Sequence, residues 1–102
     1  MAKNRGRRLP PSHPGEVLGE ILSEAGLTAN ALALALRVPA NRIGGILKGQ
    51  RGITADTALR LARYFGTSAQ MWINLQAKYD LAIAEDRLSR QIAHEVLPRK
   101  AA

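Results

Sequence analysis

The chain has 102 residues and carries 15 Lys and Arg against 8 Asp and Glu, a formal net charge of +7 at pH 7. This length provides for one small domain with a single core, so any function must lie on its surface. There is no Cys, and His13 and His94 lie far apart in the sequence, so disulfides, thiolate chemistry and a clustered metal site are excluded. We therefore expect neither a metal nor a cofactor.

The positive charge predicts a polyanionic partner. Nucleic acid is the usual one, because each neutralised phosphate releases counterions, and an anionic membrane surface is the competing interpretation. No apolar run approaches the roughly 18 residues that span a bilayer, and the basic N-terminus is not followed by the apolar segment of a secretion signal. We expect a cytoplasmic protein.

The first half of the chain predicts a basic arm followed by two helices. Residues 1–12 are basic, contain prolines and show no periodicity, which is typical of a flexible arm. A first helix is expected over 14–25, with Pro14 in its first turn and Gly26 ending it. Thr28 is a good N-cap for a second helix over 29–36, whose alternating Ala and Leu are both strong helix formers.

Three further helices are expected in the second half, which makes the fold all-α. Pro39 is well placed to begin the third, which runs to about Lys48. Thr54 caps the fourth, and a fifth begins after Ser68. Its apolar pattern weakens beyond Glu85 but permits an extension before a proline at position 98. The predicted division is an arm over 1–12, a helical domain over 13–84 and a C-terminal extension over 85–102.

The second and third helices are short and are joined by three residues. That is the geometry of a helix-turn-helix, whose second helix enters the major groove of DNA. Ordinary packing of three helices is the alternative, and the positive charge favours DNA. The third helix leaves Ala40, Asn41, Arg42, Gly44, Gly45 and Lys48 facing outward. Asn41 suits adenine and Arg42 suits guanine, or either side chain contacts a phosphate.

The adjacent Gly44 and Gly45 need an explanation, since each costs about 1 kcal/mol against Ala inside a helix. Without side chains, the helix backbone is able to approach base edges or sugars closely. The alternatives are that another group, such as a second subunit, packs against this site, or that the position simply tolerates small residues. Phosphate contacts are expected around the helix, from Thr28, Asn30, Lys48, Gln50 and Arg51. Arg60 and Arg63 are three positions apart and so share one helix face, which a solvated or protein-facing surface explains at least as well as DNA does.

Two long runs carry a family resemblance, "HPGEVLGEIL" and the run from Leu27 to Leu81 that contains "RGITADTALRLARYFGTS" and "WINLQ". They resemble the HigA-type antitoxins, also called the virulence-associated protein I or plasmid-maintenance antidote family, within the lambda-repressor-like helix-turn-helix class. The resemblance implies a five-helix domain of that class. It also implies an antitoxin that inhibits a HigB-type RNA-cleaving toxin and represses its own operon, usually as a homodimer on palindromic double-stranded DNA.

The same resemblance assigns base reading to the third helix, from Pro39 onward, and backbone contacts to the five phosphate candidates. The chain departs from the family at Gly44 and Gly45, where relatives usually carry larger or polar side chains. For the toxin surface, the first helix, the basic arm and the tail after Glu85 all stay open.

A dimer interface is expected in the last helix, because two copies of the reading helix give useful affinity and specificity. The candidates are Trp72, Tyr79, Leu88 and Ile92, with a purely intramolecular core role for Trp72 as the alternative. A regulator without a toxin partner is the main rival function. Catalysis is disfavoured, because nothing pairs a nucleophile with a base, and the arm is too polar for membrane attachment.

Overall fold

The computed structural model describes residues 12–100, and over this range the chain forms five helices. They are α1 (Pro14–Ala25), α2 (Ala29–Leu36), α3 (Ala40–Leu47), α4 (Ala55–Phe65) and α5 (Ala69–Glu95). The prediction of an all-α fold with five helices is confirmed. The predicted basic arm falls, apart from Ser12, outside the described residues.

Short polar side chains begin three of the helices, as the sequence predicts. Thr28, Thr54 and Ser68 each accept a hydrogen bond from the backbone N–H three residues ahead, at 3.0, 3.4 and 3.0 Å. These bonds satisfy donors that have no partner within the helix. Gly26 and Gly66 end α1 and α4 with φ of 66° and 73°, a left-handed conformation that costs glycine little.

One helix boundary differs from the prediction, and the extension of the last helix that the sequence permitted is present. Pro39 is the N-cap of α3 rather than its first helical residue, because its backbone is extended with ψ of 145°. The last helix is 27 residues long and runs past Glu85 to Glu95, through a stretch rich in good helix formers. No break in α5 marks the predicted boundary between 84 and 85, so that division stays a prediction.

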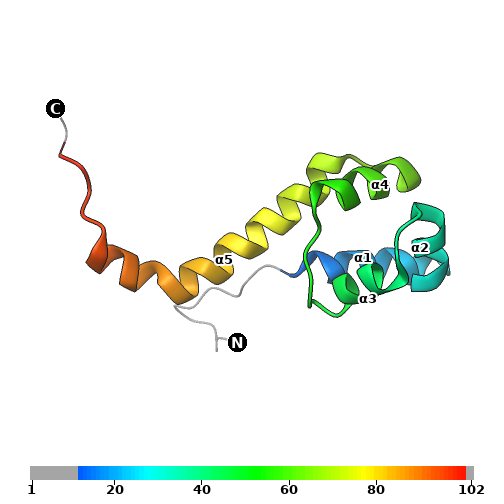
Figure 1. Ribbon diagram of the computed structural model, residues 1–102, viewed down its shortest axis with the longest axis horizontal. Helices are drawn as coiled ribbons and strands as arrows, with labels where there is room; N and C mark the ends of the chain where they lie inside the picture. The colour runs from blue at the N-terminus through cyan, green and yellow to red at the C-terminus, as the bar shows by residue number, and fades with distance from the viewer. Residues whose placement is uncertain (1–11, 101–102) are drawn as a thin grey trace.

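Apolar side chains from all five helices meet in one core. Figure 1 shows α1 to α4 gathered at the end of the molecule where α5 begins. The second half of α5 projects away from the other helices. Trp72 is fully buried, and its indole N–H donates to the hydroxyl of Thr67 at 3.1 Å. The buried set is Leu18, Leu22, Leu32, Ala33, Leu36, Ile43, Ile46, Ile53, Ala58, Leu61 and Trp72.

The start of α1 packs tightly against the end of α3. A Cβ atom at Gly15 would overlap the carbonyl oxygen of Ile46, so only glycine permits this approach. The imidazole Nδ1 of His13 accepts a hydrogen bond from the Gly15 N–H at 2.9 Å, and the same ring contacts Tyr79 edge-on at 4.8 Å. One side of α3 is thereby held against the domain, which leaves its opposite side free.

Within the described range, no single helix is both long and apolar enough to cross a membrane. Only α1 and α2 taken together pass that test, and they are bent by 100° relative to each other.

Candidate nucleic-acid interface

A tight turn joins α2 and α3, two helices of eight residues each. Arg37 ends α2 in the left-handed conformation, with φ of 62°, and its backbone N–H donates to the carbonyls of Ala33 and Leu34. The Val38 N–H also donates to the Ala33 carbonyl, at 3.0 Å, before Pro39 starts α3. This connection produces the helix-turn-helix arrangement expected from the spacing.

The outward side of α3 is defined by the two side chains it buries. Ile43 and Ile46 are fully buried, and successive helical residues are rotated by about 100°. The side opposite them therefore carries Asn41 and the Lys48 cap, with the two glycines between, and both polar side chains are exposed. Pro39 and Ala40 are exposed at the N-terminal end of the same helix.

The two adjacent glycines have different surroundings. A Cβ at Gly44 would meet nothing within 4 Å, so this position is open to a ligand. A Cβ at Gly45 would lie 3.2 Å from the Arg51 side chain, which passes over the helix there. The close-approach explanation thus fits Gly44, and the packing alternative describes Gly45.

Arg42 lies on the flank of α3 that faces α4, and its guanidinium is not free. Its Nη1 donates to Asp56 Oδ2 at 2.7 Å, and its side chain is 31% exposed. Asp56 lies in the first turn of α4, and nothing in the sequence pattern pairs it with a residue 14 positions earlier. Base reading by Arg42 stays a prediction, and Asp56 is the residue that sequence reasoning missed.

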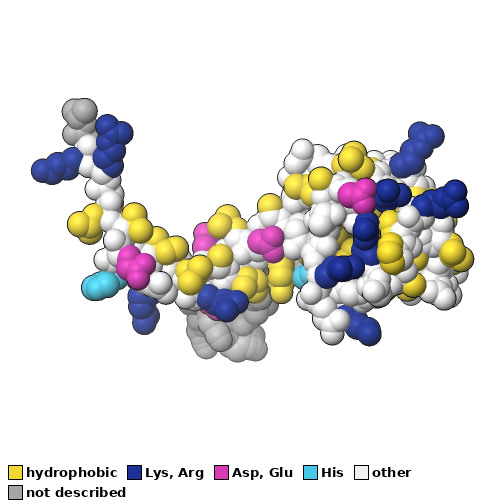
Figure 2. Space-filling view, viewed as in Figure 1, with side chains coloured by type: hydrophobic (Ala, Val, Ile, Leu, Met, Phe, Trp, Pro, Cys, Tyr) yellow, Lys and Arg dark blue, Asp and Glu magenta, His cyan; other side chains and the backbone are white. Residues whose placement is uncertain are grey.

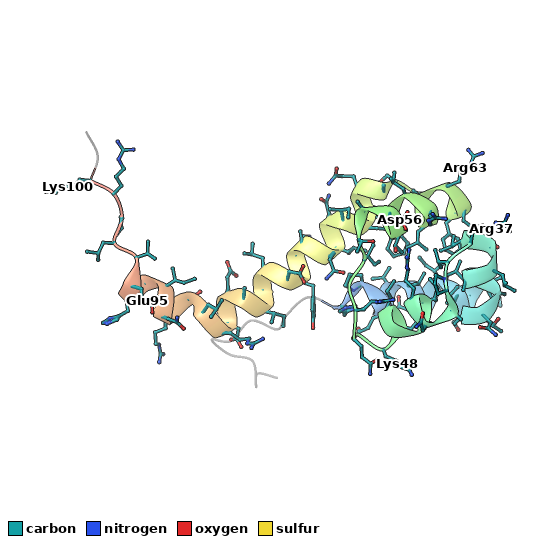
Figure 3. The ribbon with its side chains drawn as sticks, viewed as in Figure 1. Arg37, Lys48, Asp56, Arg63, Glu95 and Lys100 are labelled. Atoms are coloured by element: carbon teal, nitrogen blue, oxygen red, sulfur yellow. The ribbon has the colours of Figure 1, made fainter. Side chains whose placement is uncertain are left out.

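Asp56 also binds a second arginine. Its Oδ1 accepts from the Nε of Arg60 at 3.0 Å, while the Nη1 of Arg60 donates to the Leu36 carbonyl at 2.9 Å. The hydrogen bonds from Arg42 and then Arg60 hold the pKa of Asp56 below its ordinary value. Arg60 is thus bonded along the surface toward α2 although its side chain is 41% exposed, whereas Arg63 projects away from the domain at the end of α4 (Figure 3).

The phosphate candidates occupy two regions. Lys48, Gln50 and Arg51 follow α3 directly and are exposed, so the fold brings them beside the outward side of that helix. Thr28 and Asn30 are exposed at the start of α2, where the Thr28 hydroxyl already accepts the Ala31 N–H. On the face of the molecule drawn in Figure 2, basic side chains gather over α3 and α4, with an acidic side chain among them.

The four dimer candidates do not form one surface. Trp72 is buried in the core of its own chain, so the structure supports its intramolecular core role and not a place in a dimer interface. Tyr79 is half-buried and contacts His13. Leu88 and Ile92 are 42% and 48% exposed on the projecting half of α5, and only these two present substantial apolar surface to a second chain.

Comparison with known proteins agrees with this geometry. The helix-turn-helix family matches residues 18–72. The chain is 53% identical over 91 residues to "Virulence-associated protein I" of Dichelobacter nodosus, covering 88% of this chain and 82% of that one. It is 33% identical over 92 residues to "Antitoxin HigA-1" of Vibrio cholerae, covering 89% and 84%.

A solved structure is similar throughout. The Pseudomonas aeruginosa antitoxin HigA, solved with the higBA promoter, superimposes with a TM-score of 0.84 at 50% identity, covering 88% of this chain and 99% of that one. Such agreement in sequence, coverage and fold extends well beyond the helix-turn-helix itself. The chain therefore belongs to the helix-turn-helix family of the HigA antitoxins and virulence-associated protein I.

Proposed function

We propose that this protein is the antitoxin of a two-gene toxin-antitoxin module and represses its own promoter by inserting α3 into the major groove. The observation that carries this proposal is the outward side of α3. It presents Asn41 and Lys48 around a backbone that is bare at Gly44, while its other side is fixed in the core. A helix held in this way meets base edges without having to order itself first.

The surrounding charge supports the same mode of binding. Lys48 and Arg51 are exposed directly after α3, where we expect phosphates to flank a helix in the groove, and the sequence has a net charge of +7. Phosphate contacts set affinity and register, while contacts with base edges set the sequence that is read. The relative solved with promoter DNA shares 50% of its residues with this chain, which supports DNA as the ligand of the equivalent surface.

DNA binding is tested with the duplex upstream of the protein's own reading frame. Fluorescence anisotropy compares that duplex with a random one of the same length and at the same salt concentration. We expect promoter affinity at least about 1,000-fold above random DNA, the lower end for specific DNA-binding proteins. Equal affinity for the two duplexes would refute sequence-specific repression.

The toxin half of the proposal rests on family membership. We infer a small RNA-cleaving toxin of the HigB type as the protein partner, encoded next to this gene. Co-expression with the neighbouring reading frame, followed by pulldown and a growth-rescue assay, tests it. The absence of such a neighbour, or a neighbour that neither binds nor harms growth, would leave a stand-alone regulator as the function.

A homodimer on a palindromic operator is part of the proposal. The exposed Leu88 and Ile92 on the projecting half of α5 support it, because apolar surface of this kind is buried readily by a second copy. Light scattering of the wild type and of the double variant Leu88→Glu, Ile92→Glu tests the interface. A dimer that survives both charges would move the interface elsewhere.

The proposal includes a cytoplasmic location and a binding role without catalysis. DNA and the RNA-cleaving partner that we infer both belong to that compartment. A purified protein that cleaves RNA or DNA without its partner would contradict the second point.

A further inference from the structure

Asp56 is a carboxylate placed beside the helix that is proposed to read DNA. Figure 3 shows it at the start of α4, on the side facing α3. Both of its oxygens are occupied, Oδ2 by Arg42 at 2.7 Å and Oδ1 by Arg60 at 3.0 Å. The Asp56 side chain is still 54% exposed, so the group lies at the surface and not in the core.

A second arginine, Arg60, holds the Asp56 carboxylate on the side away from Arg42. Arg60 reaches it from the next turn of α4 and also donates to the carbonyl of Leu36, the last residue of α2. A continuous set of hydrogen bonds therefore runs from the end of α2 through Arg60 and Asp56 to Arg42 on α3. Each member originates from a helix packed into the core, so the backbone that carries Asp56 is fixed relative to the backbone that carries Arg42.

Stability alone gives little reason for this arrangement. Ion pairs between exposed side chains contribute little to folding, because solvent screens them and the side chains lose rotamer freedom. A negative charge here also opposes the attraction of phosphates to the cationic face. What the carboxylate provides is orientation: a free arginine samples many rotamers, whereas the bond to Asp56 favours one rotamer of Arg42.

We propose that Asp56 is a positioning residue that determines DNA specificity by holding the Arg42 guanidinium against the flank of α3. Asp56 occupies the Nη1 end of a group that has five N–H donors, which leaves donors for a base edge. When Asp56 holds its guanidinium, Arg42 contacts the base at one position of the site. Without Asp56, Arg42 reaches phosphates or several bases and no longer discriminates between base pairs. This inference rests on the proposed function, since it requires DNA as the ligand.

The experiment is a parallel selection from a library of randomised duplexes. The wild type is compared with Arg42→Ala, Asp56→Asn and Asp86→Asn. Asp86 is exposed on α5, has no ion pair among the described residues, and its variant matches the loss of one negative charge. Circular dichroism melting of each variant shows whether it is folded.

We expect Arg42→Ala to lose the preference for one base in each half-site. Asp56→Asn should lose the same preference at the same position by about fivefold or more, the lower range for a bidentate arginine contact. Its affinity for random duplex should be no lower than that of Asp86→Asn, because the change removes a negative charge beside the cationic face and lets Arg42 reach phosphates. A structural role for Asp56 would not produce this pattern, because loss of folding weakens all positions alike.

An Asp56→Asn variant that keeps the wild-type motif at every position would overturn the inference and leave the proposed function intact. A uniform loss at all positions, or an Arg42→Ala motif identical to the wild type, would overturn it as well. A wild-type protein that enriches no sequence would overturn the proposed function, and the inference with it.

Discussion

Replacement of Gly44 separates folding from DNA binding more sharply than any other change in α3. A Cβ there meets nothing within 4 Å, and the position lies in the interior of an eight-residue helix. Gly44→Ala should therefore stabilise the domain by about 0.5–1 kcal/mol. Because a 1 kcal/mol change shifts the melting temperature of a domain of this size by about 4–8 °C, thermal melting resolves the gain.

The effect on DNA should have the opposite sign. Gly44→Leu keeps a good helix former but fills the open space on the outward side of α3 with a group that has no hydrogen-bonding atoms. If the backbone approaches base edges there, contacts worth about 1–3 kcal/mol each are lost, and promoter affinity falls about tenfold or more per reading helix. Random-duplex affinity should change little, because the phosphate contacts remain.

Gly19→Ala is the matched control. Gly19 lies inside α1, where an added Cβ would make only ordinary contact with Leu47 at 3.8 Å, so the same stability gain should leave DNA binding unchanged. Gly45→Ala should differ from both in stability, because its Cβ would lie only 3.2 Å from the Arg51 side chain, which would have to shift. If Gly44→Leu binds the promoter as tightly as the wild type does, close approach of the helix at this position is refuted.

Four further outcomes are expected. Arg42→Ala should weaken promoter binding by about 1–3 kcal/mol in a titration if it reads guanine; an equal loss on random DNA would show a phosphate contact. Promoter affinity should fall steeply and linearly on a logarithmic scale with salt, and a flat response would exclude several phosphate contacts. Trp72→Ala should cost about 3–5 kcal/mol of unfolding free energy in urea, because the side chain is fully buried, and a small loss would contradict its core role. The lowered pKa of Asp56 means that its ion pairs stabilise the fold above the unfolded-state pKa of about 4 and stop doing so as pH falls through the lower folded-state value. The stability difference between the wild type and Asp56→Asn should therefore vanish in strong acid, and a difference independent of pH would refute this.

The positions of the helices follow from the sequence, because they depend on residues a few positions apart. Thr28 and Thr54 start α2 and α4 through bonds that span three residues, and Gly26 ends α1 where the chain needs positive φ. The three-residue connection between α2 and α3 follows from the spacing of the two predicted helices along the chain. The sequence permitted the extension of α5 beyond Glu85 without requiring it, because the apolar pattern weakens there and the second half of the helix is exposed.

The roles of individual side chains were decided by packing between helices. Arg42 and Asp56 are 14 positions apart, and only the placement of α4 against α3 brings them together. Gly44 and Gly45 are equivalent in the sequence, yet one is open and the other is covered, because the chain after α3 returns and lays Arg51 over the helix. Periodicity predicts which side of a helix is apolar, but whether the core or a second chain covers Trp72 depends on three-dimensional contacts that no local pattern encodes.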